Sequence, residues 1–181
     1  TLTANLGVTL AGMGFKVGIL DADIYGPSMP LMFDVMSDRP GGIEVEGVRK
    51  MEPVESYGVK VMSIGFFAGT DQAVVWRGPM LMGALQQMLG QVAWGDLDVL
   101  LLDLPPGTGD VAMSVPQLVP GAQVVVVTTP QVAAADVAER SGAVGLQTGQ
   151  SVFGVIENMA WLEQSDGTRL DLFGAGGGEL V

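Results

Sequence analysis

The chain has 181 residues, of which 48% are hydrophobic, and this size and composition suit one compact α/β domain with a full core. Its formal net charge of −12 disfavours sequence-independent binding to nucleic acid and to anionic membranes, because both depend on clustered Lys and Arg. The sequence has no cysteine and no histidine, the usual ligands of zinc and iron–sulfur clusters, so any bound metal would be a hard cation such as Mg²⁺, held by oxygen.

The first predicted element is a helix over residues 2–13, where leucines recur at helical spacing and Gly14 is a natural stop. No strand and no initiator Met precede it, and residues 173–181 stop where a glycine-rich turn leads toward another helix. We therefore expect a single domain over residues 1–181 that is incomplete at both ends, with its first strand and phosphate loop missing before Thr1. No signal-peptide pattern and no apolar run of about 18 residues is present, so we expect a cytoplasmic protein that does not span a membrane.

Strands and helices alternate along the predicted path of the chain. Residues 16–20 read as a strand, residues 28–36 as a short helix, residues 41–67 as a hairpin-like excursion and residues 79–92 as a helix. The side chains expected to face the core are Met29, Met32, Phe33 and Met36 in the short helix, and Met80, Ala84, Leu85, Met88 and Leu89 in the longer one.

Two later strands, over residues 99–102 and 124–128, are continuous apolar runs, which is typical of strands covered on both faces. Residues 133–144 then read as a helix and residues 151–156 as a strand. This alternation predicts an α/β fold with an open, mostly parallel sheet and helices on both faces. Ligands of such sheets bind beyond the carboxyl ends of the strands, so the residues after each apolar run are candidate site residues.

Asp21 and Asp23 follow the first predicted strand, in the stretch LDADIYGPSMP. Alternate residues of an extended strand point the same way, so both carboxylates would lean toward one space. Two close anions are costly unless a cation or a proton separates them, and hydrated Mg²⁺ would leave one carboxylate to orient an attacking water. A solvated strand end with an Asx turn explains the same stretch equally well when it is taken alone.

Asp103 ends the apolar run VLLLD, which is the Walker B arrangement, where the aspartate holds Mg²⁺ through water. The stiff turn PPGTG, residues 105–109, would respond to a γ-phosphate. Asn158 ends the last predicted strand and suits a purine edge, although a strand-terminal Asn in a turn is the simpler explanation for this residue alone. With the helix start at Thr1 these residues describe a nucleotide–Mg²⁺ site, but the chain contains no G-x-x-x-x-G-K-[ST] phosphate loop.

Six motifs in the chain resemble those of the Mrp-type (ApbC-like) ATPases. In order they are LDADIYGPSMP, VVWRGPMLMGALQQML, LLLDLPPGTGD, TTPQ, GVIENM and FGAGGGE, and together they cover nearly the whole chain. The family comprises iron–sulfur cluster carriers of the MinD/ParA deviant-Walker-A class. The resemblance implies a P-loop NTPase fold, binding and hydrolysis of ATP with Mg²⁺, a homodimer, and iron–sulfur acceptor or scaffold proteins as partners.

The resemblance also implies roles for individual residues. Asp21 is similar to the switch aspartate near Mg²⁺, Asp23 to the aspartate that positions the hydrolytic water, and Asp103 to the Walker B aspartate. Asn158 resembles the Asn that contacts adenine in this class, and Thr1 resembles the Thr that follows the Ser/Thr of the phosphate loop.

Two features limit what the resemblance implies. Arg77, in WRGPM, is a candidate interface or phosphate-side residue, and a surface Arg before a proline-started helix is the equal alternative. The family's metal-binding Cys-x-x-Cys would fall within residues 160–172, which have no cysteine and in which residues 165–168 read as a hairpin turn.

We expect an ATP-hydrolysing iron–sulfur cluster carrier whose cluster is handled outside this chain or by a partner. The alternatives are a MinD/ParA-like nucleotide switch, regulatory or scaffolding and without a cluster, and a folded remnant without activity.

Overall fold

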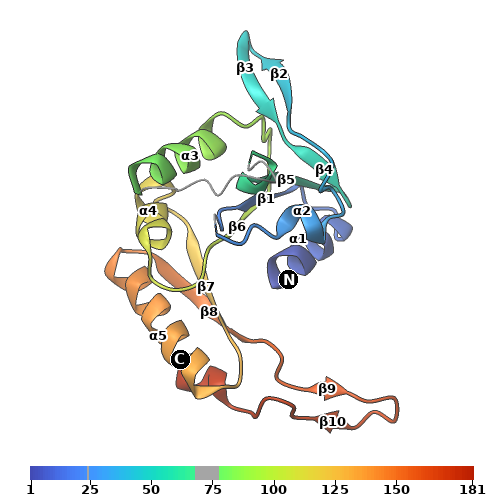
Figure 1. The fold of residues 1–181 in the computed structure, drawn as a ribbon, viewed down its shortest axis with the longest axis vertical. Coiled ribbons are helices and arrows are strands. Elements are labelled where there is room, and N and C mark those ends of the chain that lie inside the picture. Colours follow the sequence, from blue (N-terminus) through green and yellow to red (C-terminus); the bar gives the residue numbers. More distant parts are fainter. Residues whose placement is uncertain (24, 68–77) are drawn as a thin grey trace. The chain divides into compact units, whose positions relative to one another are not determined.

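The computed structural model describes residues 1–23, 25–67 and 78–181 (Figure 1). The chain forms two compact units, Thr1–Pro105 and Pro106–Val181. Within the described residues, no helix has both the length and the apolar character needed to cross a membrane.

The first unit is built on a four-stranded sheet with the order β4-β5-β1-β6. Strands β1 (Val17–Asp21), β5 (Val59–Ser63) and β6 (Val99–Asp103) run parallel, and the short β4 (Val54–Ser56) pairs antiparallel with β5. All five residues of β1 are buried, because this strand lies inside the sheet. The predicted mostly parallel sheet is therefore present in this unit.

Helix α1 (Leu2–Gly12) packs against β1, β5 and β6. The close approach depends on Gly7, because a Cβ at this position would lie 2.6 Å from Cδ1 of Ile19 on β1. The unit also contains α2 (Met29–Met32), the 3-10 turn η1 (Ile64–Phe66) and α3 (Gly78–Gly90).

Strands β2 (Gly41–Val45) and β3 (Val48–Glu52) form an antiparallel hairpin that extends away from the sheet of this unit (Figure 1). The inner end of the hairpin is tied to the residues after α3, because the backbone N–H of Met51 donates to the carbonyl of Gln91 at 2.8 Å. Residues 41–67, predicted as a hairpin-like excursion, therefore contain two antiparallel pairs. The pair β2–β3 is the projecting hairpin, and the pair β4–β5 belongs to the central sheet.

The second unit contains a parallel pair of strands, β7 (Gln123–Thr128) and β8 (Ser151–Glu157). Helix α5 (Val132–Gln147) packs on both strands, and α4 (Asp110–Leu118) contacts α5. Gly145 of α5 allows this packing, because a Cβ there would already lie 3.2 Å from Cγ2 of Val124. The unit ends with the hairpin of β9 (Leu162–Glu163) and β10 (Arg169–Leu170) and the 3-10 turn η2 (Gly177–Leu180).

The methionine stripe predicted for residues 28–36 is only half correct. Met29 and Phe33 are buried, whereas Met32 is 40% and Met36 59% exposed. The helix there has four residues, so helical spacing does not continue as far as Met36.

Two other burial predictions are correct only in part. In α3, Leu85 and Met88 are buried as expected, but Met80 is 54% exposed. Strand β7 alternates between covered and open residues instead of being covered on both faces, and Val125 and Val127 are 41% and 47% exposed.

Candidate functional site

Three neighbouring strands of the first unit each end with a polar residue. The register pairs Asp21 of β1 with Ser63 of β5 on one side and with Asp103 of β6 on the other. Adjacent strands lie about 4.8 Å apart, so these residues form a row across the carboxyl end of the sheet. This is the end at which α/β sheets bind their ligands, which makes the row the candidate site.

Asp21, in the middle of the row, is fully buried. Its Oδ2 accepts hydrogen bonds from the backbone N–H groups of Ser28 and Met29, both at 3.0 Å, and from the hydroxyl of Ser63 at 2.9 Å. Its Oδ1 accepts the backbone N–H of Asp23 at 3.2 Å. A carboxylate has about four lone-pair sites, so Oδ2 is fully used and Oδ1 keeps one site for a cation or a metal-bound water.

Burial raises the pKa of Asp21 above its ordinary value of 3.8. The hydrogen bonds from Met29, Ser63 and Asp23 lower the pKa, and the nearby charge of Asp103 raises it. A divalent cation between Asp21 and Asp103 would reduce both the cost of burial and the repulsion between the carboxylates.

Asp23 lies in the loop after the strand, because β1 ends at Asp21. The expectation that strand alternation aims both carboxylates the same way is therefore wrong. The half-buried Asp23 instead accepts, at Oδ1, the backbone N–H groups of Tyr25 and Gly26, both at 3.1 Å, as in the Asx turn considered above. Its Oδ2 accepts no hydrogen bond from the described residues, so this oxygen is available to a water.

The carboxylate of Asp103 is half-buried, and its Oδ1 accepts a hydrogen bond from the hydroxyl of Thr3 in α1 at 2.5 Å. Its backbone carbonyl accepts the N–H of Ala22 at 2.9 Å, which extends the pairing of β6 with β1 by one residue. Its Oδ2 has no partner among the described residues. Sequence reasoning missed Thr3, since the only signal was a second Thr two residues after Thr1.

The remaining predicted site residues are Thr1, Arg77 and Asn158. Thr1 is exposed at the start of α1, where its carbonyl accepts the backbone N–H of Asn5 at 3.1 Å. Arg77 lies outside the described residues. Asn158 belongs to the second unit, where its Oδ1 accepts the N–H of Met159 at 3.0 Å and its Nδ2 donates to no described residue.

Three sequence motifs of the second unit meet around the end of β8. A Cβ on Gly177, in FGAGGGE, would lie 2.4 Å from the carbonyl oxygen of Thr129 and 2.8 Å from Cα of Pro130, both in TTPQ. The backbone N–H of Gly178 donates to Oε2 of Glu157, in GVIENM, at 2.6 Å. The absence of a side chain at Gly177 thus allows the end of the chain to pack directly on the loop after β7. Gly178 is bonded to Glu157, the residue before Asn158.

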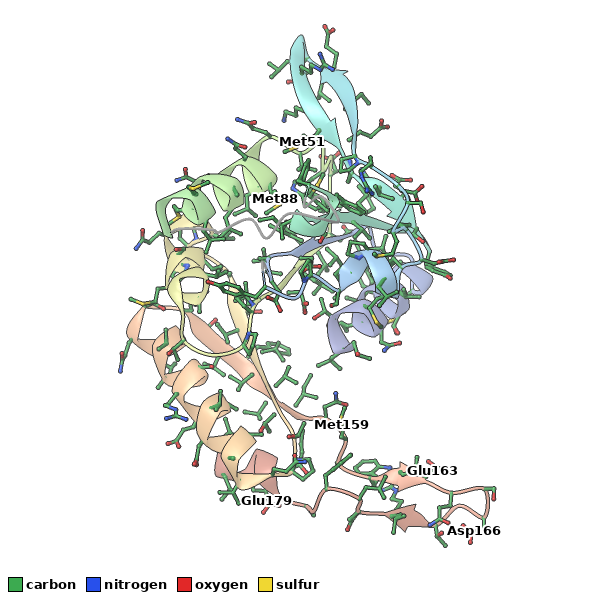
Figure 2. All side chains as sticks on the ribbon, in the orientation of Figure 1. Met51, Met88, Met159, Glu163, Asp166 and Glu179 are labelled. Carbon is green, nitrogen blue, oxygen red and sulfur yellow. The ribbon has the colours of Figure 1, made fainter. Side chains whose placement is uncertain are left out.

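The β9–β10 hairpin extends from the second unit as an arm, with Met159 near its base and Glu163 and Asp166 along it (Figure 2). At its turn, Oδ1 of Asp166 accepts the N–H and the hydroxyl of Thr168 at 2.9 and 2.6 Å. These two bonds hold the pKa of Asp166 below its ordinary value of 3.8. The hairpin turn predicted for residues 165–168 is confirmed.

Metal binding at the row would need ligands from a nucleotide or from water. Among the residues that the structure describes, no group of three or more Asp, Glu, Cys or His side chains is arranged to hold a metal ion. Mg²⁺ in nucleotide sites uses only one or two carboxylates, with phosphate and water oxygens as its other ligands. The free oxygen of Asp103 and the remaining lone-pair site of Asp21 fit that need.

Comparison with known proteins identifies the family of the chain. The family model described as ParA, NUBPL iron-transfer P-loop NTPase, matches residues 1–181. The chain belongs to this family. The family and the P-loop NTPase fold predicted from the sequence are therefore confirmed.

Relatives of the chain include two named iron–sulfur cluster carrier proteins. The protein of Mycobacterium tuberculosis (strain H37Rv) is 55% identical over 181 residues, covering 100% of this chain and 46% of the relative. That of Bacillus subtilis is 48% identical over 182 residues, covering 100% of this chain and 50% of the relative. The chain thus spans about half the length of the curated relatives it matches.

Two solved structures share the fold. The nucleotide-binding protein of Archaeoglobus fulgidus in complex with ADP superposes with a TM-score of 0.81 at 41% identity, covering 98% of this chain and 68% of that one. The MinC:MinD complex of Aquifex aeolicus gives a TM-score of 0.57 at 16% identity, covering 93% of this chain and 67% of that one, which supports the fold alone.

Proposed function

We propose that this chain is the nucleotide-binding part of an ATP-hydrolysing iron–sulfur cluster carrier. The observation that carries the proposal is the set of open acceptor sites on three carboxylates at the end of the parallel sheet. Oδ2 of Asp23 and Oδ2 of Asp103 have no partner among the described residues, and Oδ1 of Asp21 keeps one lone-pair site. The names of the relatives and the ADP complex of the Archaeoglobus protein support it. We also infer a cytoplasmic homodimer that passes clusters to acceptor or scaffold proteins, with Arg77 on the interface or beside the phosphates.

Hydrolysis of ATP needs a cation on the phosphates and an oriented water. Asp103, through Oδ2, and Asp21, through Oδ1, are the residues that would hold Mg²⁺, directly or through water. When bound, Mg²⁺ would neutralise charge on the phosphate oxygens. Asp23 would accept a hydrogen bond from the attacking water at Oδ2, while the N–H groups of Tyr25 and Gly26 keep its carboxylate in place.

Two further residues are proposed to contact the nucleotide. Asn158 would contact adenine through Nδ2, and Thr1 would lie next to the phosphates. The phosphate loop itself is not in this sequence, so tight phosphate binding would depend on residues outside it.

The test is Asp23→Asn in the complete gene product, which keeps the size of the side chain but removes its charge. We expect ATP turnover to fall at least about a hundredfold, as for loss of a group that orients or accepts the proton of a nucleophile, while ATP affinity stays within about threefold. Asp96→Asn is the matched control, because Asp96 is exposed and its side chain has no hydrogen bond among the described residues. Turnover near wild type in Asp23→Asn would show that the assigned role is wrong.

A second function, a nucleotide switch without a cluster, is favoured by the composition. The 181 residues contain no cysteine, so this chain offers no thiolate ligand, and the arm at residues 160–172 is closed by hydrogen bonds. Anaerobic reconstitution of the complete gene product with iron and sulfide distinguishes the two. A stoichiometric cluster that transfers to an acceptor supports the carrier, and its absence leaves the switch.

A further inference from the structure

The hydroxyl of Ser63, at the end of β5, is hydrogen-bonded to the carboxylate of Asp21. Ser63 is fully buried, donates to Oδ2 of Asp21 at 2.9 Å and accepts the backbone N–H of Gly65 at 3.0 Å. A serine hydroxyl has a single proton. The bond from Gly65 uses a lone pair of the hydroxyl oxygen, so the single proton is donated to Asp21.

Ser63 differs from the other donors to Asp21 in its place in the fold. The remaining three donors are N–H groups of Asp23, Ser28 and Met29, which all belong to the segment that follows β1. They would move together with that segment, whereas the carboxylate is carried by Asp21 at the end of β1. Among the described residues, Ser63 is the one donor to Asp21 that comes from a different strand.

We propose that Ser63 is a positioning residue for ATP hydrolysis, which ties the carboxylate of Asp21, and with it the loop that carries Asp23, to the sheet. The carboxylate plane is fixed when Oδ2 is held from two directions, by the start of α2 and by β5. Its Oδ1 is then directed at the backbone N–H of Asp23, which sets where the Asp23 loop begins. This inference rests on the proposed function, because Asp23 must orient the water for its placement to matter.

The test compares Ser63→Ala with Ser56→Ala in the complete gene product. Ser56 is a matched control on the adjacent strand β4: it is half-buried, and its hydroxyl donates to the carbonyl of Phe33 at 2.9 Å, away from the carboxylates. Ser56→Ala loses one internal hydrogen bond, whereas Ser63→Ala loses two, the one donated to Asp21 and the one accepted from Gly65. We therefore expect a larger decrease in the midpoint of urea unfolding for Ser63→Ala than for Ser56→Ala, and kcat is compared on folded protein only.

Only Ser63→Ala should slow the reaction. We expect its kcat to fall roughly tenfold or more, because a small misplacement of a group that orients a nucleophile is costly, while its KM for ATP stays within about threefold. Ser63→Thr, which keeps the hydroxyl, should restore most of the kcat. If Ser63→Ala does not fold, Ser63→Cys against Ser56→Cys gives the same comparison, since a thiol is a weak donor.

Equal kcat values for Ser63→Ala and Ser56→Ala, measured on equal amounts of folded protein, would overturn the positioning role. The same conclusion follows if Ser63→Thr turns over as slowly as Ser63→Ala. Full activity of Asp23→Asn would instead overturn the proposed function. The two failures are therefore distinguishable.

Discussion

Asp21→Ala and Asp23→Ala remove the same carboxylate from positions two residues apart, yet they should differ strongly in stability. In Asp21→Ala the buried donors of Met29 and Ser63 lose their acceptor, and each such loss costs about 1–3 kcal/mol. Removing a carboxylate whose pKa is raised by burial recovers part of that cost, so we expect a net loss of about 2–3 kcal/mol. In Asp23→Ala the freed N–H groups of Tyr25 and Gly26 are exposed to water, and we expect a loss of less than about 1 kcal/mol.

Urea unfolding followed by far-ultraviolet circular dichroism measures this difference. With a denaturant dependence of about 2 kcal/mol per molar urea, the midpoints of the two alanine variants should lie roughly 1 M apart. Asp96→Ala, at an exposed position with no side-chain bond among the described residues, should unfold like the native protein. Midpoints of Asp21→Ala and Asp23→Ala within about 0.3 M of each other would refute the assignment of Asp21 as the buried anchor of the loop.

Two further predictions concern pH and packing. Because the pKa of Asp21 is raised, the native protein binds a proton at this carboxylate more tightly than the unfolded chain does. The contribution of this proton to the free energy of unfolding is complete below about pH 3.8 and is lost as the pH rises through the native pKa. Asp21→Asn cannot titrate there, so thermal unfolding in EDTA should show its stability rising relative to the native protein above pH 3.8, and a constant difference would contradict the raised pKa. Gly177→Ala places a Cβ 2.4 Å from the carbonyl of Thr129 and should cost about 1–3 kcal/mol in urea unfolding. Gly121→Ala, where a Cβ meets nothing within 4 Å, is its control, and equal midpoints would show that the contact relaxes without cost.

The sheet was predictable because its strands carry strong local signals. The apolar runs that become β1 and β6 end in Asp21 and Asp103. Both residues lie at the carboxyl ends of parallel strands, as predicted from the sequence. The burial errors have local causes. Helical spacing predicts a face only while the helix lasts, and α2 stops after four residues, so Met36 falls outside it.

Two residues of the site left almost no trace in the sequence. Ser63 belongs to the row because β5 pairs with β1, and that pairing was hidden by the reading of residues 41–67 as one excursion. Thr3 reaches Asp103 because α1 packs across β1 and β6. Both contacts join segments far apart in the chain, so they depend on the order of the strands and not on any local pattern.

The spacing of Asp21 and Asp23 has a physical consequence that a longer strand would not allow. Had β1 continued through Asp23, both carboxylates would lie on one face of the strand and both would be buried. Each negative charge would then raise the free energy of the other. Because the strand stops at Asp21, one carboxylate is buried and bound by four protein donors, while the other is turned by Tyr25 and Gly26 and keeps an oxygen open. If the proposed function is correct, the buried carboxylate would hold the loop in every state of the nucleotide, and the half-buried one would respond to the water and phosphate that change during hydrolysis.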